Sequence, residues 1–67
     1  MDKIFTENLK YYLGCKNKTQ REIAEQLGVV ESCYANWEQG RTEPDIAHIR
    51  QLCEILDISP NQLFEKN

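Results

Sequence analysis

Residues 19–40 read TQREIAEQLGVVESCYANWEQG, a segment in which two short helical patterns meet at one glycine. The first pattern begins at Thr19, because Glu22 lies three residues later and completes a capping box that satisfies otherwise free N–H groups. Gly28 follows at the position where a residue in the left-handed conformation ends a helix. The segment therefore predicts a helix over about residues 19–27 and a tight turn at Gly28.

The second half of the segment predicts a helix over about residues 30–39 with one apolar and one polar face. Val30, Tyr34 and Trp37 recur at spacings of four and three, so we expect them to hold this helix in the core. The positions opposite or beside this stripe are Glu31, Ser32, Cys33, Ala35, Asn36 and Gln39. Short polar side chains of this kind suit a helix that enters the major groove of DNA.

Helices are also expected on both sides of this segment. The first should run from about Lys3 to Cys15 and end at Asn17, the best non-glycine candidate for a left-handed cap. Its expected core positions are Phe5, Leu9 and either Tyr12 or Leu13. Another helix should follow Pro44 with Asp45 as its N-cap. Its apolar stripe contains Ile46, Ile49, Leu52, Cys53 and Leu56.

A last helical turn is predicted after Ser59. Ser59 caps it, Pro60 occupies the first helical position and Gln62 completes a second capping box. Leu63 and Phe64 would then point at the core or at a partner.

The chain length favours a single all-α domain over residues 1–67. A chain of 67 residues has room for one small core, and no linker or low-complexity segment interrupts it. No apolar run is long enough to span a bilayer, and the start of the chain does not resemble a signal peptide. We therefore expect a soluble, cytoplasmic protein with no membrane contact.

The sequence argues against an enzyme. Cys15, Cys33 and Cys53 are separated by 18 and 20 residues, which fits neither a disulfide framework nor a zinc site, so reduced thiols are expected. Cys53 falls on an apolar stripe, whereas Cys33 borders the polar face and is the thiol to watch for oxidation. His48 has no carboxylate or serine at a catalytic spacing, and no phosphate-binding loop is present. We expect no catalytic residue, metal, cofactor or small-molecule ligand.

The segment resembles the helix-turn-helix of the phage Cro and repressor family, also called the XRE family. The residues that carry the resemblance are Thr19, Gln20, Ala24, Leu27, Gly28, Val29, Ser32, Trp37, Glu38, Gly40 and Pro44. The likeness extends from about Phe5 to Phe64. It implies a five-helix, lambda-repressor-like fold and a transcriptional regulator, a repressor by preference, that binds specific sequences of double-stranded DNA.

The resemblance also assigns roles to residues. Glu31, Ser32 and Asn36 match positions that contact bases; an Asn amide pairs with adenine, whereas an acid at Glu31 is equally explained by the helix dipole. The positions that match phosphate contacts are Lys18, Gln20, Arg21, Arg41 and Thr42. Gln20 would in addition brace the recognition helix.

The overall charge is the main argument against DNA binding. Eight Lys and Arg against 11 Asp and Glu give a net charge of −3, whereas nucleic-acid binders are usually basic. However, residues 1–21 contain five basic and two acidic residues, which gives +3 and leaves −6 for the remainder. Lys16, Lys18 and Arg21 precede or begin the first motif helix, and Arg41 follows the second. For Lys16 and Lys18 a solvated charge run is an equally open interpretation.

Two departures from the family pattern bear on the site. Val30 stands where Ser or Thr usually caps the recognition helix, a loss of about 1 kcal/mol. Leu13 stands where many members have an Arg that pairs with the acid matching Glu38. We therefore expect Glu38 to find another partner, for example Arg41, or to remain hydrated.

Members of this family generally bind DNA as dimers, so the resemblance implies a homodimer. Ile58, Leu63 and Phe64 are the expected apolar contact, although they could equally close the core. The alternative function is an acidic protein-interaction module whose partner is a regulator or a toxin, with weak or lost DNA binding.

Overall fold

Five helices follow one another in the computed structural model, which describes residues 3–66. They are α1 (Lys3–Cys15), α2 (Gln20–Leu27), α3 (Glu31–Gln39), α4 (Ile46–Leu56) and α5 (Pro60–Phe64). The expected all-α, five-helix architecture is confirmed, and the bounds of α1 coincide with those predicted.

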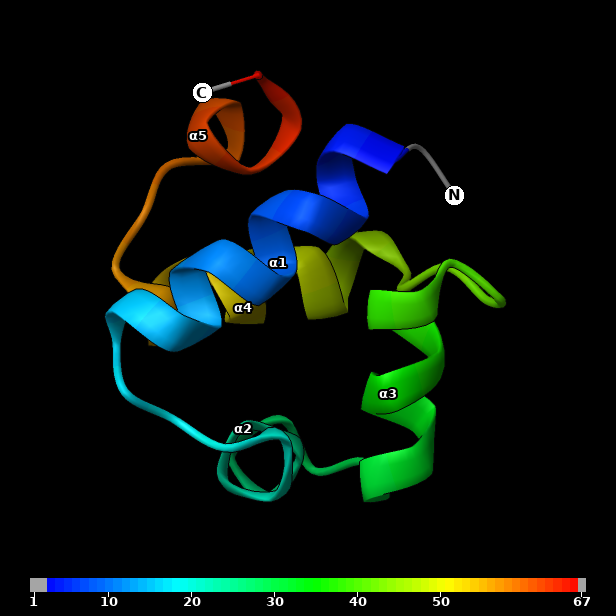
Figure 1. Ribbon diagram of the computed structural model, residues 1–67. Helices are drawn as coiled ribbons and strands as arrows, with labels where there is room; N and C mark the ends of the chain where they lie inside the picture. The colour runs from blue at the N-terminus through cyan, green and yellow to red at the C-terminus, as the bar shows by residue number, and fades with distance from the viewer. Residues whose placement is uncertain (1–2, 67) are drawn as a thin grey trace.

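The helices are arranged so that α2 and α3 pack together at one side of the molecule. In Figure 1, α1 crosses the middle, α5 lies above it, α2 lies below it and α3 stands to the right. The helix α4 lies on the far side from α1, and α5 contacts both of them. The helices α1 and α3 also pack on each other, as do α2 and α4, so each motif helix is supported by the rest of the fold.

Helix boundaries follow the capping residues that the sequence predicted. The Thr19 hydroxyl accepts from the Glu22 backbone N–H at 3.1 Å, and the Glu22 carboxylate accepts from the Thr19 N–H at 3.0 Å. Asp45 caps α4, and Ser59 caps α5 in a second reciprocal box. Asn17 follows α1 with φ of 55°. These four predictions are confirmed. They could be made from the sequence because each cap depends on residues a few positions away.

The turn between α2 and α3 is built on Gly28, which has φ of 76° and ψ of 26°. Its N–H lies against the carbonyls of Ala24 and Glu25, and the Val29 N–H donates to the Ala24 carbonyl at 3.0 Å. This is the pattern of a Schellman motif, which satisfies the last carbonyls of a helix while reversing the chain. The predicted left-handed residue at Gly28 is confirmed.

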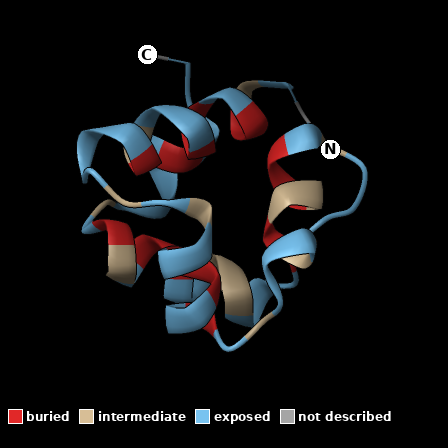
Figure 2. Ribbon diagram, turned by 60° about the horizontal axis from the view of Figure 1, so that its bottom comes forward, coloured by how far each residue is buried: buried red, intermediate tan, exposed pale blue. Residues whose placement is uncertain are grey.

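One apolar cluster joins all five helices, and Figure 2 shows the buried faces turned toward the interior. Its completely buried large side chains are Phe5, Leu9, Ile23, Tyr34, Leu52, Leu56 and Leu63. Leu13 is buried while Tyr12 is half-buried, which settles the alternative left open for α1. Cys53 is buried, as predicted from its place on the apolar stripe.

Two residues that the sequence placed in the core lie on the surface. Val30 is 69% exposed, so the prediction that it holds α3 in the core is wrong. Val30 is the N-cap of α3 with an extended backbone, and the angular spacing of a helix does not apply to a residue outside it. Ile46, the first residue of α4, is 72% exposed, whereas Ile49, one turn later, packs against the core.

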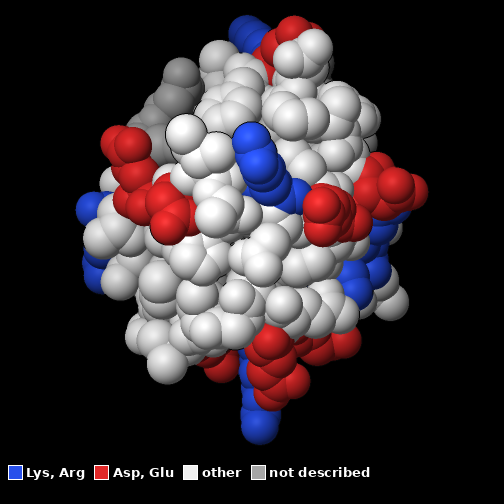
Figure 3. Space-filling view, turned by 180° about the vertical axis from the view of Figure 1, so that it is seen from behind, with Lys and Arg blue, Asp and Glu red and all other residues white. Residues whose placement is uncertain are grey.

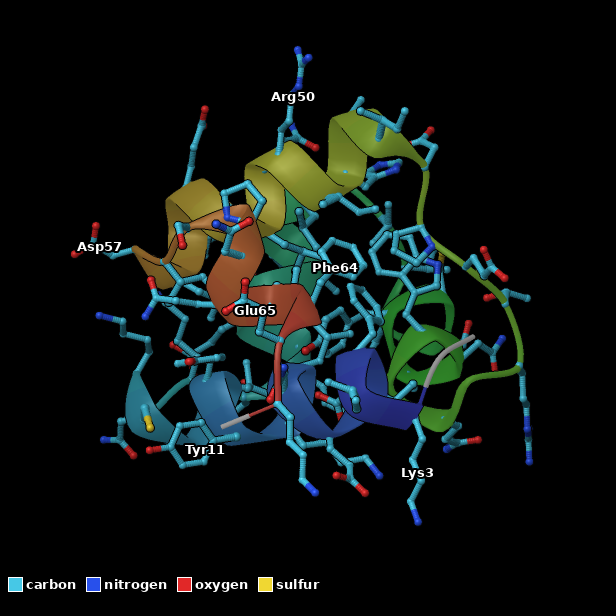
Figure 4. All side chains as sticks on the ribbon, turned by 90° about the horizontal axis from the view of Figure 1, so that it is seen from above. Lys3, Tyr11, Arg50, Asp57, Phe64 and Glu65 are labelled. Carbon is cyan, nitrogen blue, oxygen red and sulfur yellow. The ribbon has the colours of Figure 1, made fainter. Side chains whose placement is uncertain are left out.

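A buried amide fastens the end of the chain to α1. The Asn8 side-chain nitrogen donates to the carbonyls of Leu63 and Glu65 at 2.8 Å each and to that of Gln62 at 3.2 Å. The ring of Phe64 stacks on Phe5 with a centroid distance of 5.1 Å, and Figure 4 shows Phe64 over the interior of the molecule. The amide therefore satisfies carbonyls that a helix C-terminus leaves free.

Replacing Gly28 by Ala should lower the free energy of unfolding by about 1–2 kcal/mol, because an L-residue with a Cβ is strained at this positive φ. No atom lies within 4 Å of the added Cβ, so the loss is purely conformational. Gly14, near the end of α1, also has open space and serves as the control: Gly14→Ala should raise stability by about 0.5–1 kcal/mol. Urea denaturation measures both values, and effects of equal sign would contradict this account.

Candidate nucleic-acid interface

The outer face of α3 is polar and partly open. Glu31, Ser32 and Gln39 are exposed, and Ala35 and Asn36 are half-buried. Within α3, the exposed and half-buried positions are those that the sequence placed opposite or beside the apolar stripe. The face offers a carboxylate, a hydroxyl and amides at its surface.

The inner face of α3 is held by two aromatic side chains. Tyr34 is completely buried and Trp37 is 3% exposed, as the sequence predicted. Their rings meet edge to face with a centroid distance of 6.1 Å. Because both rings are fixed in the core, the outer face of α3 has a defined direction.

Glu38 is buried beside α2. It is 7% exposed, and its Oε1 accepts a hydrogen bond from Gln20 Nε2 at 3.0 Å. The expectation that Glu38 finds another partner is confirmed, but the partner is Gln20 and not Arg41, because Glu38 lies on the side of α3 that faces the start of α2. Glu38 is also buried, so the alternative that it stays hydrated is wrong. Gln20 braces the end of α3 through this bond. The family resemblance predicted that Gln20 braces the recognition helix, and this is confirmed; the sequence did not identify Glu38 as its partner, since the two residues are 18 positions apart.

The second oxygen of Glu38 lies in a polar spot inside the core. Neither Glu38 Oε2 nor the Tyr34 hydroxyl has a hydrogen-bond partner among the described residues. Burial, and then the Glu38 carboxylate nearby, raise the pKa of Tyr34 above its usual value. The hydroxyl of Tyr34 therefore stays protonated over the whole neutral range.

The predicted phosphate-binding side chains lie around α2 and the end of α3. Arg21, Arg41 and Thr42 are exposed, and Lys18 is half-buried. Arg21 lies 3.5 Å from Glu25, but both side chains are largely exposed, so this ion pair is weak and readily exchanged for another anion. Gly40, with φ of 75°, ends α3, and the Arg41 N–H donates to the Asn36 carbonyl at 2.9 Å. The loop that carries Arg41 thus has a fixed start.

The loop ends at α4 in a small cluster around His48. The backbone N–H of His48 donates to Asp45 Oδ1 at 2.9 Å, and His48 Nδ1 lies 2.9 Å from the same oxygen. This backbone hydrogen bond, with a smaller contribution from the His48 side chain, lowers the pKa of Asp45. The His48 ring also packs on Trp37, with a centroid distance of 5.2 Å. His48 is half-buried in this cluster.

On another side of the described surface, basic and acidic side chains are mixed. Figure 3 shows the side on which α4 lies, where basic and acidic side chains of the described residues are interspersed. Within residues 3–66 no cluster of His, Cys, Asp and Glu could hold a metal ion. Over the same residues no helix is long and apolar enough to cross a membrane.

The expected dimer patch is partly an element of the core. Leu63 is completely buried, so its assignment as a contact with a second copy is wrong. Ile58 is half-buried and packs against the core, and Phe64 stays 45% exposed although it stacks on Phe5. The alternative, that these residues close the core, is correct for Leu63, which is the completely buried apolar side chain of α5.

A comparison with known protein families agrees with the arrangement of α2, the turn at Gly28 and α3. A family model described as a helix-turn-helix domain matches residues 6–67. The chain belongs to the helix-turn-helix domain family. This agrees with the Cro/repressor-like resemblance in the sequence.

Several helix-turn-helix proteins are similar to this chain. It is 36% identical to the uncharacterized HTH-type transcriptional regulator YqaE of Bacillus subtilis and 32% identical to the prophage-derived regulator YonR of the same organism, each over 92% of the chain. It covers 53% and 57% of these relatives, so it spans about half their length. The solution structure of the SOS-response transcriptional repressor LexA from Eubacterium rectale superposes with a TM-score of 0.87 at 33% identity, over 96% of this chain and 68% of that one.

Removing the amide that Glu38 contacts should destabilise the domain. Gln20→Ala leaves a buried carboxylate oxygen without its donor, so we expect the free energy of unfolding to fall by about 1–3 kcal/mol. In a Glu38→Gln background the same change should cost less, because a neutral group replaces the buried charge. A double-mutant cycle in urea measures the coupling. Gln26→Ala, at an exposed position of α2, is the control, and an equal effect at both positions would refute the bracing role.

Proposed function

We propose that this chain is a sequence-specific DNA-binding regulator that inserts α3 into the major groove. The observation that carries the proposal is the polar outer face of α3, held in place by the buried rings of Tyr34 and Trp37 within a helix-turn-helix domain. Because amides and hydroxyls on a rigid helix can match the donors and acceptors of base edges, such a face suits direct readout of sequence.

Within this proposal the side chains divide into two groups. Glu31, Ser32 and Asn36 contact bases: the Asn36 amide pairs with adenine, Ser32 donates or accepts, and Glu31 accepts from a cytosine amino group or only stabilises the helix start. The residues assigned to phosphates are Lys18, Gln20, Arg21, Arg41 and Thr42. Phosphate contacts fix the position of α3 on the duplex and supply affinity that depends on salt.

We also propose that the chain binds DNA as a homodimer and acts as a repressor in the cytoplasm. A domain of this size buries little surface on DNA, so two copies on half-sites about one turn apart give useful affinity. The exposed part of Phe64 and the half-buried Ile58 are the remaining apolar candidates for that contact. A repressor is favoured by the similar LexA protein, whereas another relative, BcrR of Enterococcus faecalis, is named an activator.

A protein-interaction module is the second candidate function. The net charge of −3 and the exposed acid at the start of α3 favour it, because a carboxylate there repels nearby phosphates. Its partner would be another regulator or a toxin. The two candidates differ in what they predict for duplex DNA.

Selection from a random duplex library at moderate salt separates them. The regulator should enrich one motif, with the spacing of two half-sites if it binds as a dimer. If no sequence is enriched and affinity for every duplex stays in the weak non-specific range, the regulator proposal is wrong and the interaction module is favoured.

Two substitutions test the division of roles. Asn36→Ala should relax base preference at one position of the enriched motif, with a loss of about 1–3 kcal/mol for the preferred base. Arg41→Ala should weaken all sequences alike and lower the slope of log K against log salt by about 1. Fluorescence anisotropy titrations over a salt series measure both, and indistinguishable effects would contradict the assigned roles.

A further inference from the structure

Val30 is an apolar side chain on the surface at the start of α3. It is 69% exposed, while its neighbour Val29 is half-buried and packs against the core. The Val30 side chain forms no cap hydrogen bond, although Val30 is the N-cap residue. Its isopropyl group therefore contributes little to the core and nothing to the helix end.

Two stability rules are broken at this one position. Ser, Thr, Asp and Asn are the residues that satisfy a free N–H group at an N-cap, and the other capped helices here use Thr19, Asp45 and Ser59. A large exposed apolar side chain gains no burial energy either. A residue that violates local preferences without a compensating contact marks a position to be explained by function.

The place of Val30 indicates what it could contact. It directly precedes Glu31 and Ser32, and in a major-groove helix the N-terminal residues lie nearest the base edges. An isopropyl group has no donor or acceptor, so it gains nothing from the polar edges of guanine, adenine or cytosine. The 5-methyl group of thymine is the one apolar group among the base features of the major groove.

We propose that Val30 contacts the 5-methyl group of a thymine and thereby specifies that base. This inference rests on the proposed function, since it requires α3 to lie in the major groove. It makes Val30 a specificity-determining residue in addition to Glu31, Ser32 and Asn36.

Deoxyuridine, which lacks only the 5-methyl group, provides the direct test. The probe is the duplex enriched by selection, with each thymine replaced in turn by deoxyuridine. At one position in each half-site the replacement should weaken binding of the unmodified protein roughly fourfold, the effect of one methyl group leaving apolar contact. The same replacement should change the affinity of Val30→Ser less than twofold. Anisotropy titrations give the dissociation constants.

Val30→Ser also separates binding from folding. A serine here supplies the missing cap, so the midpoint of thermal unfolding should rise while thymine preference is lost. Val30→Thr is nearly isosteric and keeps one methyl group, so it should be stabilised and retain part of the sensitivity to deoxyuridine. Ile46→Ser is the matched control: Ile46 is equally exposed but begins α4, and its replacement should leave the deoxyuridine profile unchanged.

The outcomes distinguish this inference from the function it rests on. An enriched motif for which the parent protein and Val30→Ser show the same deoxyuridine profile would overturn the contact and leave DNA readout by α3 intact. A motif with no preferred thymine would do the same. If selection enriches no sequence, the regulator proposal itself fails, and the thymine contact fails with it.

Discussion

The left-handed turn at Gly28 is the constraint on which the rest of the arrangement depends. A positive φ at this residue turns the chain out of α2 while the last carbonyls of α2 remain hydrogen-bonded. With α2 and α3 packed on each other, the Gln20 amide reaches Glu38 and the aromatic rings of α3 lie in the core. One backbone conformation thus fixes the direction of the polar face.

Helix ends and helix types were predictable because their causes are local. Thr19 with Glu22, and Ser59 with Gln62, satisfy N–H groups within three residues of each other, so the sequence shows both partners of each bond. The errors at Val30 and Ile46 share one origin. In both cases a helical period was extended to the edge of the helix, where the angular pattern or the neighbouring elements no longer apply.

Contacts between distant polar residues could not be predicted in the same way. Asn8 and Glu38 look like ordinary surface residues of amphipathic helices, because periodicity describes which side of a helix is apolar and says nothing of which polar groups meet. The candidate site shows the same limit. The outward direction of Ser32 and the burial of Trp37 followed from spacing, whereas the buried state of Leu63 depended on how α5 docks. The DNA contacts themselves stay predictions.

The Asn8 amide has a consequence for how the domain assembles during synthesis. Its acceptors lie 54 to 57 positions later in the chain, so this closure is available only after α5 has left the ribosome. The turn between α2 and α3 can form before α5 is synthesised, since its hydrogen bonds join residues that are close in the sequence. We therefore expect a nascent chain in which the motif forms early and stays loosely held until α5 packs on α1.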